Sequence, residues 1–375
     1  MIINNAKVYR NGHFESASIE FDSHIRSFSP GEGMDACGAY IIPGLIDVHT
    51  HGAMGIDASD CTAEQIHHLA QFYSDNGVTS FCFTTLTVPA DELRGAMKNI
   101  RAYERFGGEA KCTGVHLEGP FVSRGKCGAQ NPDNIRKPDI ALFNELNELS
   151  GGMVRLITVA PEVEGALDFI REASKVCTVS LGHSTADYDQ AMAGFEAGAT
   201  HVTHLFNGME PFHHRKPGLV GAALTAGANV ELICDGVHIH PAMILAVHKM
   251  FGDRLIIVSD SLRCAGLCDG RYNLGGLPMI VRDGRATLLD GTIAGSSSNL
   301  LQELRNVVSY GVPLEAAVKA MTETPAKDIG VFDSIGSLEV SKCADFLVLN
   351  KDLKLMATFI DGKLVNGTTD FESVK

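Results

Sequence analysis

Short apolar runs alternate with segments of helical periodicity through most of the chain. Apolar runs bounded by turn residues predict strands, and apolar positions recurring every three or four residues predict helices. The predicted strands are 41–48, 78–84, 113–117, 154–159, 177–181, 201–204, 230–234 and 255–259. The predicted helices between them are 62–76, 91–105, 162–174, 188–197 and 241–251. This alternation predicts an α/β fold built on a parallel sheet.

Polar residues at the ends of these strands decide between two parallel-sheet architectures. Eight strands with intervening helices suit a (β/α)8 TIM barrel, although a doubly wound open sheet has a similar periodicity. Histidine or carboxylate side chains follow six of the eight strands: His49 and His51, Glu118, His183, His204, Asp235 and His238, and Asp260. The carboxyl ends of all barrel strands meet at one mouth, whereas an open sheet spreads them along an edge. The sequence therefore predicts a barrel with these side chains gathered at its mouth.

Two histidines stand one residue apart in GLIDVHTHG, residues 44–52. Side chains alternate faces along a strand, so His49 and His51 point the same way, although such pairs also occur on ordinary surfaces. Glu118, His183 and His204 supply three further ligands, the number that leaves an open position for water at a catalytic zinc. We therefore expect a principal metal on these three residues. A second metal position on His49 and His51 would be bridged by Glu118.

Asp260 ends the last strand and has no metal-binding role in this scheme. A metal lowers the pKa of bound water toward neutrality, and Asp260 could take the water's proton and deliver it to a leaving group. Each residue also has a structural interpretation, since Glu118 could cap a turn and Asp260 could cap a helix. The structural interpretation would require several such residues to occur at the same barrel mouth by coincidence. The pattern therefore favours a metal-assisted hydrolase.

Both ends of the chain are rich in predicted strands and lie outside the barrel pattern. The sequences NG at 11–12 and DG at 361–362 are typical of hairpin turns. Neither end has enough core alone, so we expect the two to pair into one small β-sandwich domain. The predicted division is a sandwich of 1–42 and 338–375 and a barrel of 43–337. A further excursion at 274–293, with DG turns at 283–284 and 290–291, interrupts the chain after the last barrel strand.

Composition narrows the class of protein. The 375 residues are 45% hydrophobic and 20% charged, as in an ordinary globular protein. The net charge of −14 argues against nucleic acid and anionic membranes as partners. No apolar stretch is long enough to span a bilayer, and the first residues lack the pattern of a signal peptide. Ten scattered cysteines without a CxxC pair predict reduced thiols in a cytoplasm.

Seven motifs resemble those of one enzyme family. GLIDVHTHG, VHLEGPF, SLGHS, THLFNGM, DGVHIHP, VSD and AGSS occur in the order found in N-acetylglucosamine-6-phosphate deacetylases of the amidohydrolase superfamily. The resemblance runs from about residue 40 to 345. HLEGPF together with THLFN is specific to this branch, because dihydroorotases and hydantoinases typically use a barrel lysine where the glutamate of HLEGP stands. The resemblance implies a barrel with a flanking sandwich.

The resemblance also implies roles for particular residues. Glu118, His183 and His204 would hold the principal metal, and Asp260 would be the catalytic acid–base. Arg215, in HHRKPG, would bind the substrate's phosphate and reach the neighbouring subunit's site; from composition alone this segment had suggested only a solvated loop. The remaining residues matched to substrate contacts are Ala129, Gln130, Asn207, Gly208, Asp235, His238, Ile293, Ala294 and Gly295. Some relatives carry histidine where Gln130 stands.

The expected protein is a cytoplasmic homodimer that hydrolyses N-acetylglucosamine 6-phosphate to glucosamine 6-phosphate and acetate. Its cofactor would be a divalent metal, one or two per subunit, with zinc expected first and iron or manganese as alternatives. Two rival functions stay open: deacetylation of the N-acetylgalactosamine 6-phosphate isomer, and a non-catalytic metal-binding scaffold. No role can be assigned to Cys264 and Cys268, which follow Asp260.

Overall fold

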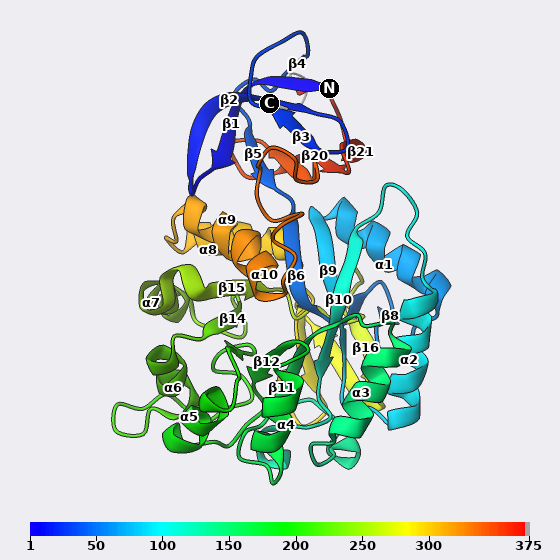
Figure 1. Cartoon of the computed structure of the whole chain (residues 1–375), viewed down its shortest axis with the longest axis vertical. Coiled ribbons are helices and arrows are strands. Elements are labelled where there is room, and N and C mark those ends of the chain that lie inside the picture. The colour runs from blue at the N-terminus through cyan, green and yellow to red at the C-terminus, as the bar shows by residue number, and fades with distance from the viewer. Residues whose placement is uncertain (372–375) are drawn as a thin grey trace.

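The computed structural model describes residues 1–371 and contains a barrel of eight parallel strands (Figure 1). Each barrel strand pairs with its neighbour in sequence. The strands are β6 (Leu45–Thr50), β9 (Val78–Thr85), β10 (Lys111–Glu118), β11 (Val154–Val159), β12 (Thr178–Leu181), β13 (His201–Val202), β14 (Asn229–Ile233) and β15 (Leu255–Val258). The first and last strands meet where the His51 amide donates to the Ser261 carbonyl at 2.8 Å and the Asp260 amide donates to the His49 carbonyl at 2.9 Å. The predicted barrel is confirmed.

Helices surround the barrel and cover its apolar outer face (Figure 1). The helices are α1 (Ala63–Asp75), α2 (Ala90–Ala102), α3 (Ile140–Leu149), α4 (Ala166–Ala173), α5 (Tyr188–Glu196), α6 (Gly218–Ala226), α7 (Pro241–Phe251), α8 (Leu300–Ser309), α9 (Leu314–Met321) and α10 (Glu323–Asp328). Short 3-10 turns lie at Arg124–Lys126, Pro132–Asn134 and Gly252–Arg254. Helices α3, α6, α8, α9 and α10 were not predicted. In α6, GLVGAALTA, small and apolar residues leave no amphipathic pattern to find.

Two predicted strands end differently in the structure. The range 41–48 is divided at Gly44 into β5 (Tyr40–Pro43), which pairs outside the barrel, and β6. A Cβ at Gly44 would lie 2.1 Å from Oγ1 of Thr79, so only glycine allows the chain to pass this closely. The predicted strand 201–204 stops at Val202, because the chain leaves strand geometry before His204, whose φ is 24°.

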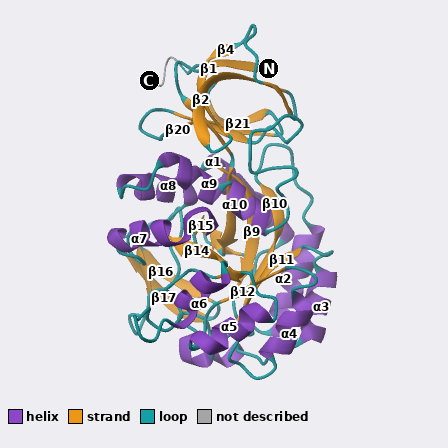
Figure 2. Cartoon of the chain, turned by 60° about the vertical axis from the view of Figure 1, so that its left-hand side comes forward, coloured by secondary structure: helices purple, strands orange, loops and turns teal. Residues whose placement is uncertain are grey.

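The two chain ends join in one eight-stranded sheet at one end of the molecule (Figures 1 and 2). It contains β1 (Ile2–Arg10), β2 (His13–Phe21), β3 (Ile25–Ser27), β4 (Met34–Asp35), β5, β19 (Phe346–Leu349), β20 (Leu355–Ile360) and β21 (Lys363–Gly367). The rings of Phe21 in β2 and Phe346 in β19 pack with their centroids 4.9 Å apart, although β1 and β5 separate these strands in the sheet. A flat sheet would hold them about 14 Å apart. The sheet therefore folds over its own core as a sandwich; the domain boundaries at 42/43 and 337/338 stay a prediction.

An antiparallel excursion follows the last barrel strand, as expected, but begins at Gly270. Its strands are β16 (Gly270–Leu274), β17 (Leu277–Arg282) and β18 (Arg285–Leu288), and a small hairpin near the mouth is formed by β7 (Gly52–Ala53) and β8 (Ile56–Asp57). The DG turn at 283–284 joins β17 to β18 as predicted. Among residues 1–371, no helix combines the length and apolarity that a membrane crossing requires.

Candidate active site

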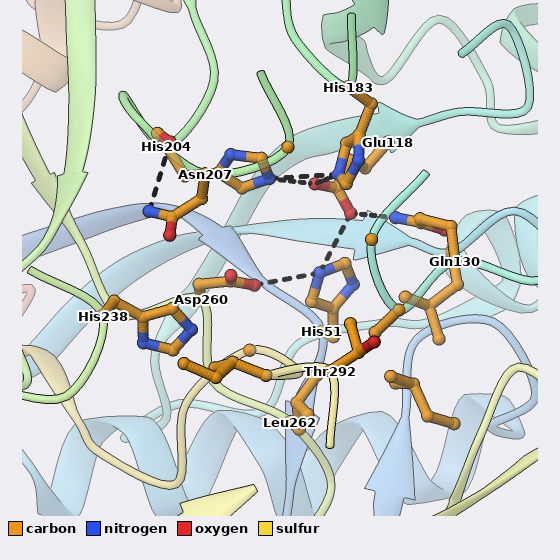
Figure 3. Close-up of a pocket in the computed structure, with 17 residues that line it drawn as sticks. His51, Glu118, Gln130, His183, His204, Asn207, His238, Asp260, Leu262 and Thr292 are labelled. Carbon is orange, nitrogen blue, oxygen red and sulfur yellow. Dashed lines mark hydrogen bonds and ion pairs between the residues drawn. The ribbon is translucent and has the colours of Figure 1, made fainter. Parts of the chain in front are cut away.

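Three of the predicted site residues adopt a backbone conformation that side chains rarely allow. His183, His204 and Asp260 have φ angles of 46°, 24° and 46°. Positive φ in residues other than glycine costs free energy and is concentrated at functional sites. All three lie just beyond the end of a barrel strand, where the backbone turns their side chains toward the mouth (Figure 3).

Glu118, His183 and His204 bring one ligand atom each to a common point. Oε1 of Glu118 lies 3.0 Å from Nε2 of His183 and 2.9 Å from Nε2 of His204, and the two nitrogens are 3.1 Å apart. Behind the ring, Nδ1 of His183 donates to the carbonyl of Lys126 at 2.9 Å. Nε2 of His183 therefore presents a lone pair to the centre. A carboxylate and two imidazoles arranged in this way suit a divalent metal ion.

His49, His51 and Asp260 form a second group beside the first. Oδ1 of Asp260 is 3.5 Å from Nε2 of His49 and 3.2 Å from Nε2 of His51. Glu118 faces both groups, since its oxygens also lie 3.4 Å from Nε2 of His49 and 3.3 Å from Nε2 of His51. This geometry supports a bridging role for Glu118, and it also brings Asp260 closer to the second group than we expected from the sequence.

The outer nitrogens of His49 and His51 are occupied, as that of His183 is. Nδ1 of His49 lies 2.8 Å from a carboxylate oxygen of Glu231, and Nδ1 of His51 lies 3.1 Å from the carbonyl of Thr84. The inner nitrogens of both rings are left facing the centre, and buried Nε2 of His49 has no hydrogen-bond partner. Histidine ligands are commonly held by acceptors behind the ring in this way. The residues present therefore fit two neighbouring metal positions.

The two central carboxyl groups are held in their charged form. Burial by itself raises the pKa of Glu118, but the imidazoles of His49 and His183 outweigh it and hold this pKa well below its usual range. Burial also acts against ionisation of Asp260, and His49 and His51 again lower its pKa. The site thus gathers two buried negative charges among four imidazole rings.

A cavity of about 190 Å³ opens above these groups (Figure 3). Of the predicted residues it is lined by Glu118, His183, His204, His51, Asp260, Ala129, Gln130, Asn207, Gly208, His238, Ile293 and Gly295. His49 lies beneath its floor with no exposed surface, and Ala294 is buried beside the wall. Asp235 does not line the cavity but holds His238, whose Nδ1 is 2.8 Å from its carboxylate. The predicted side chains therefore meet in one place, with one exception.

Arg215 lies apart from this cavity. It is exposed, contacts His214 at 2.8 Å and lines a separate hollow with Glu210 and Lys216. Among the described residues that line the cavity, none is a lysine or arginine. The expected contact of Arg215 with phosphate across a subunit boundary stays a prediction.

Gln130 uses both ends of its side-chain amide within the protein. Its carbonyl accepts a hydrogen bond from the Thr87 amide at 2.6 Å, and its amide nitrogen donates to Oε2 of Glu118. The side chain is 5% exposed and borders the cavity. Gln130 therefore anchors the central carboxylate, while its predicted contact with substrate stays a prediction.

Sequence reasoning missed Glu231, whose carboxylate lies directly behind His49 and His204. It stands in the middle of β14, NVELI, with no exposed surface. An ionisable residue inside a fully buried apolar strand needs a partner, because an unpaired buried charge is costly. That interruption of the apolar run was the available signal.

Comparison with known proteins adds an independent line of support. A model of the amidohydrolase family matches residues 40–365. The chain is 36% identical to an N-acetylglucosamine-6-phosphate deacetylase of Vibrio furnissii, across 87% of this chain and 82% of that protein. It is also 36% identical to an N-acetylgalactosamine-6-phosphate deacetylase of Escherichia coli O157:H7, across 87% of this chain and 88% of that one.

A solved structure is similar over nearly the whole chain. It is that of a variant N-acetyl-D-glucosamine-6-phosphate deacetylase from Mycobacterium smegmatis, in complex with N-acetyl-D-glucosamine 6-phosphate. The TM-score is 0.91 at 30% sequence identity, and the match covers 97% of this chain and 99% of the other. Both the barrel and the terminal sheet are thus shared with that structure.

Proposed function

The chain belongs to the amidohydrolase family, and we propose that it hydrolyses N-acetyl-D-glucosamine 6-phosphate to D-glucosamine 6-phosphate and acetate. One observation supports this most directly. The Glu118, His183 and His204 ligand atoms and the carboxylate of Asp260 border the same small cavity. They do so in a chain 36% identical to a deacetylase for this substrate.

Glu118, His183 and His204 would hold the principal divalent metal. When bound, the ion acts as a Lewis acid toward the acetyl carbonyl and the attacking water. His49 and His51 would hold a second ion more weakly. We propose zinc first, with iron or manganese as alternatives, since imidazole and carboxylate ligands suit all three.

Asp260 moves the proton that the reaction requires. As a carboxylate it accepts a proton from the attacking water while the carbon–oxygen bond forms at the acetyl carbon. It then gives that proton to the sugar's nitrogen as the carbon–nitrogen bond breaks, so the amine leaves neutral with acetic acid, which ionises to acetate in solution. Its position at the edge of the cavity, with 9% of the side chain exposed, allows contact with both groups.

The cavity walls would orient the sugar. His238, held by Asp235, would contact a sugar hydroxyl or the phosphate, and Asn207 would donate its amide. Because none of the described lining residues is a lysine or arginine, we propose a homodimer in which Arg215 approaches the phosphate from the second copy. An arginine suits this task because its planar fork donates paired hydrogen bonds to phosphate oxygens.

We also propose that the protein works in the cytoplasm. All ten cysteines are free, and persistent free thiols suit a reducing compartment. The substrate and product would then belong to the breakdown and recycling of amino sugars.

The galactosamine isomer remains the second candidate substrate, because the Escherichia coli relative that acts on it is equally identical to this chain. The two sugars differ only at the C4 hydroxyl, and a few hydrogen bonds decide between them. Amine release should be measured from both 6-phosphates and from unphosphorylated N-acetylglucosamine. A preference for the glucosamine compound supports the proposal, and a preference for the isomer replaces the substrate. Metal binding without turnover of any of the three would favour a non-catalytic scaffold.

A further inference from the structure

A buried carboxylate behind the metal centre contacts a residue from each group of ligands. One oxygen of Glu231, Oε2, lies 2.8 Å from Nδ1 of His49 and accepts a hydrogen bond from the main-chain amide of His204 at 3.1 Å. His49 belongs to the second ligand group and His204 to the first. Because Glu231 has no exposed surface, both contacts lie in the barrel interior, away from solvent.

The chain of contacts continues from Glu231 to the opposite end of the barrel. The other oxygen of Glu231 lies 3.2 Å from Nε2 of His201, at the start of β13, an ion-pair distance without hydrogen-bond geometry. Nδ1 of His201 lies 2.8 Å from Asp328, at the end of α10, and the Asn229 side chain donates to the same carboxylate at 2.7 Å. His201 and Asn229 begin their strands, so Asp328 closes the end of the barrel opposite to the mouth.

A positive charge on His201 explains how Glu231 and Asp328 can stay ionised in the barrel interior. Burial acts to lower the pKa of His201, but Asp328 and Glu231 outweigh it and raise that pKa to about 10. The raised pKa favours the imidazolium form of His201, whose positive charge would offset the two carboxylates beside it. A buried carboxylate keeps a fixed position when hydrogen bonds and a counter-charge satisfy it.

His49 differs from the other proposed ligands in what holds its ring. His51 and His183 meet main-chain carbonyls, of Thr84 and Lys126. Only His49 among these three meets a side chain, and that side chain carries a negative charge. An anionic acceptor fixes the tautomer of a histidine ligand and increases its basicity toward a metal.

We propose that Glu231 is a positioning residue of the metal centre, acting through His49 and through the main chain of His204. It holds Nε2 of His49 toward Glu118, while His201 and Asp328 hold Glu231 in place. The inference rests on the proposed function, because it takes His49 to be a metal ligand. It adds a determinant of metal affinity that does not border the cavity.

The test compares two glutamate-to-glutamine variants of the metal-loaded protein. Glu231→Gln keeps the size of the side chain and removes its charge. Glu303→Gln is the control for replacing a buried glutamate, because Glu303 is equally buried and accepts a hydrogen bond from the Cys234 amide at 2.9 Å. Burial raises the pKa of Glu303 well above its usual range, so this control makes the same change of side chain without removing a charge beside a proposed ligand. Zinc per subunit is measured during competition with a chelator, together with the melting temperature and the 15N chemical shifts of His49.

In Glu231→Gln, the affinity for the second zinc equivalent should fall about 10–100-fold, the usual effect of losing such a partner. The first equivalent should change less, and Glu303→Gln should retain both. The His49 shifts should show loss of the single Nδ1–H tautomer in Glu231→Gln alone. If Glu231→Gln does not fold, Asp328→Asn serves instead and should weaken the second equivalent in the same direction.

Two results would overturn the inference. One is a folded Glu231→Gln protein that binds both equivalents as tightly as the wild type; the other is equal metal loss in Glu231→Gln and Glu303→Gln. A wild-type protein that binds only one zinc equivalent and still deacetylates also refutes it but leaves the proposed reaction standing. A wild-type protein that binds no metal and releases no amine refutes the proposed function itself.

Discussion

Two clusters of carboxylates lie at opposite ends of the barrel and differ in the groups that balance their negative charge. At the end near the terminal sheet, Lys111 contacts Asp345 at 2.7 Å and Asp361 at 2.6 Å, and Arg105 also contacts Asp361. We call these four residues the joint cluster. At the mouth, Glu118 and Asp260 meet only imidazoles and the Gln130 amide among their described side-chain partners.

The comparison shows that a group of potential ligands is not by itself a metal site. Cys343, Asp345 and Asp361 are also close enough together to hold an ion. There, however, the ammonium group of Lys111 already bonds both carboxylates, so the chain supplies its own cation. At the mouth no lysine or arginine of the described residues bonds the carboxylates, and His49, His51 and His183 turn Nε2 toward the centre because their outer nitrogens are engaged elsewhere. A bound metal ion would balance the carboxylates at the mouth, whereas Lys111 and Arg105 already balance those of the joint cluster.

Removing metal should have the largest effect of the changes considered, and it should act on the mouth and not on the joint cluster. Treatment with a strong chelator is expected to reduce deacetylation to background, since the site would lose its Lewis acid. The melting temperature should also fall, because an ion that binds only the folded state stabilises it. Amine release and thermal unfolding are measured before and after zinc is restored. Full activity in a preparation shown to contain no metal would contradict this expectation.

Asp260→Asn should separate proton transfer from metal binding at the mouth. Turnover is expected to fall roughly 10³-fold, because general acid–base catalysis contributes about 10²–10⁴-fold. Binding of the principal metal and of a substrate analogue should persist, since Glu118, His183 and His204 remain. Steady-state kinetics and metal analysis on the same sample check both halves. Turnover close to that of the wild type would exclude the proposed role of Asp260.

His49→Asn and His51→Asn should distinguish the two proposed metal positions at the mouth. Each variant is expected to lose the second zinc equivalent and keep the first, which lowers turnover less than loss of both. Zinc per subunit, determined at equal free zinc concentration, is the measurement. Unchanged stoichiometry in both variants would refute a second position on these histidines.

Lys111→Met should affect stability without affecting the mouth. It leaves Asp345 buried without its cation, and we expect the free energy of unfolding to fall by about 3 kcal/mol. Metal content and the kinetics of amine release should stay as in the wild type, because the joint cluster lies at the other end of the barrel. Denaturant unfolding measures the first quantity. A loss of metal in this variant would show that the two clusters are coupled.

Much of the site could be predicted because the fold converts sequence position into spatial position. Glu118, His183, His204 and Asp260 all follow apolar runs, and parallel barrel strands bring such positions to one mouth. The helices with amphipathic patterns were predictable for a similar local reason, as was the start of α1, where Thr62 and Gln65 form a capping box.

Other features depend on contacts between residues distant in the chain. The division at Gly44 follows from the approach of Thr79, and the engagement of Gln130 follows from where Thr87 and Glu118 happen to lie. Neither leaves a periodic signal, because periodicity reports burial and not the identity of the partner.

The sequence by itself determined the barrel, the strand ends that carry its chemistry and the kinds of ligand available, since these depend on local pattern and residue type. Only the tertiary structure decided which nitrogen of each histidine faces the centre, that Glu231 stands behind His49, and that Lys111 already neutralises the joint cluster. The physical reason is that a buried polar group is defined by its hydrogen-bond partners. Such partners can be far apart in the chain: His49 and Glu231 are separated by 182 residues.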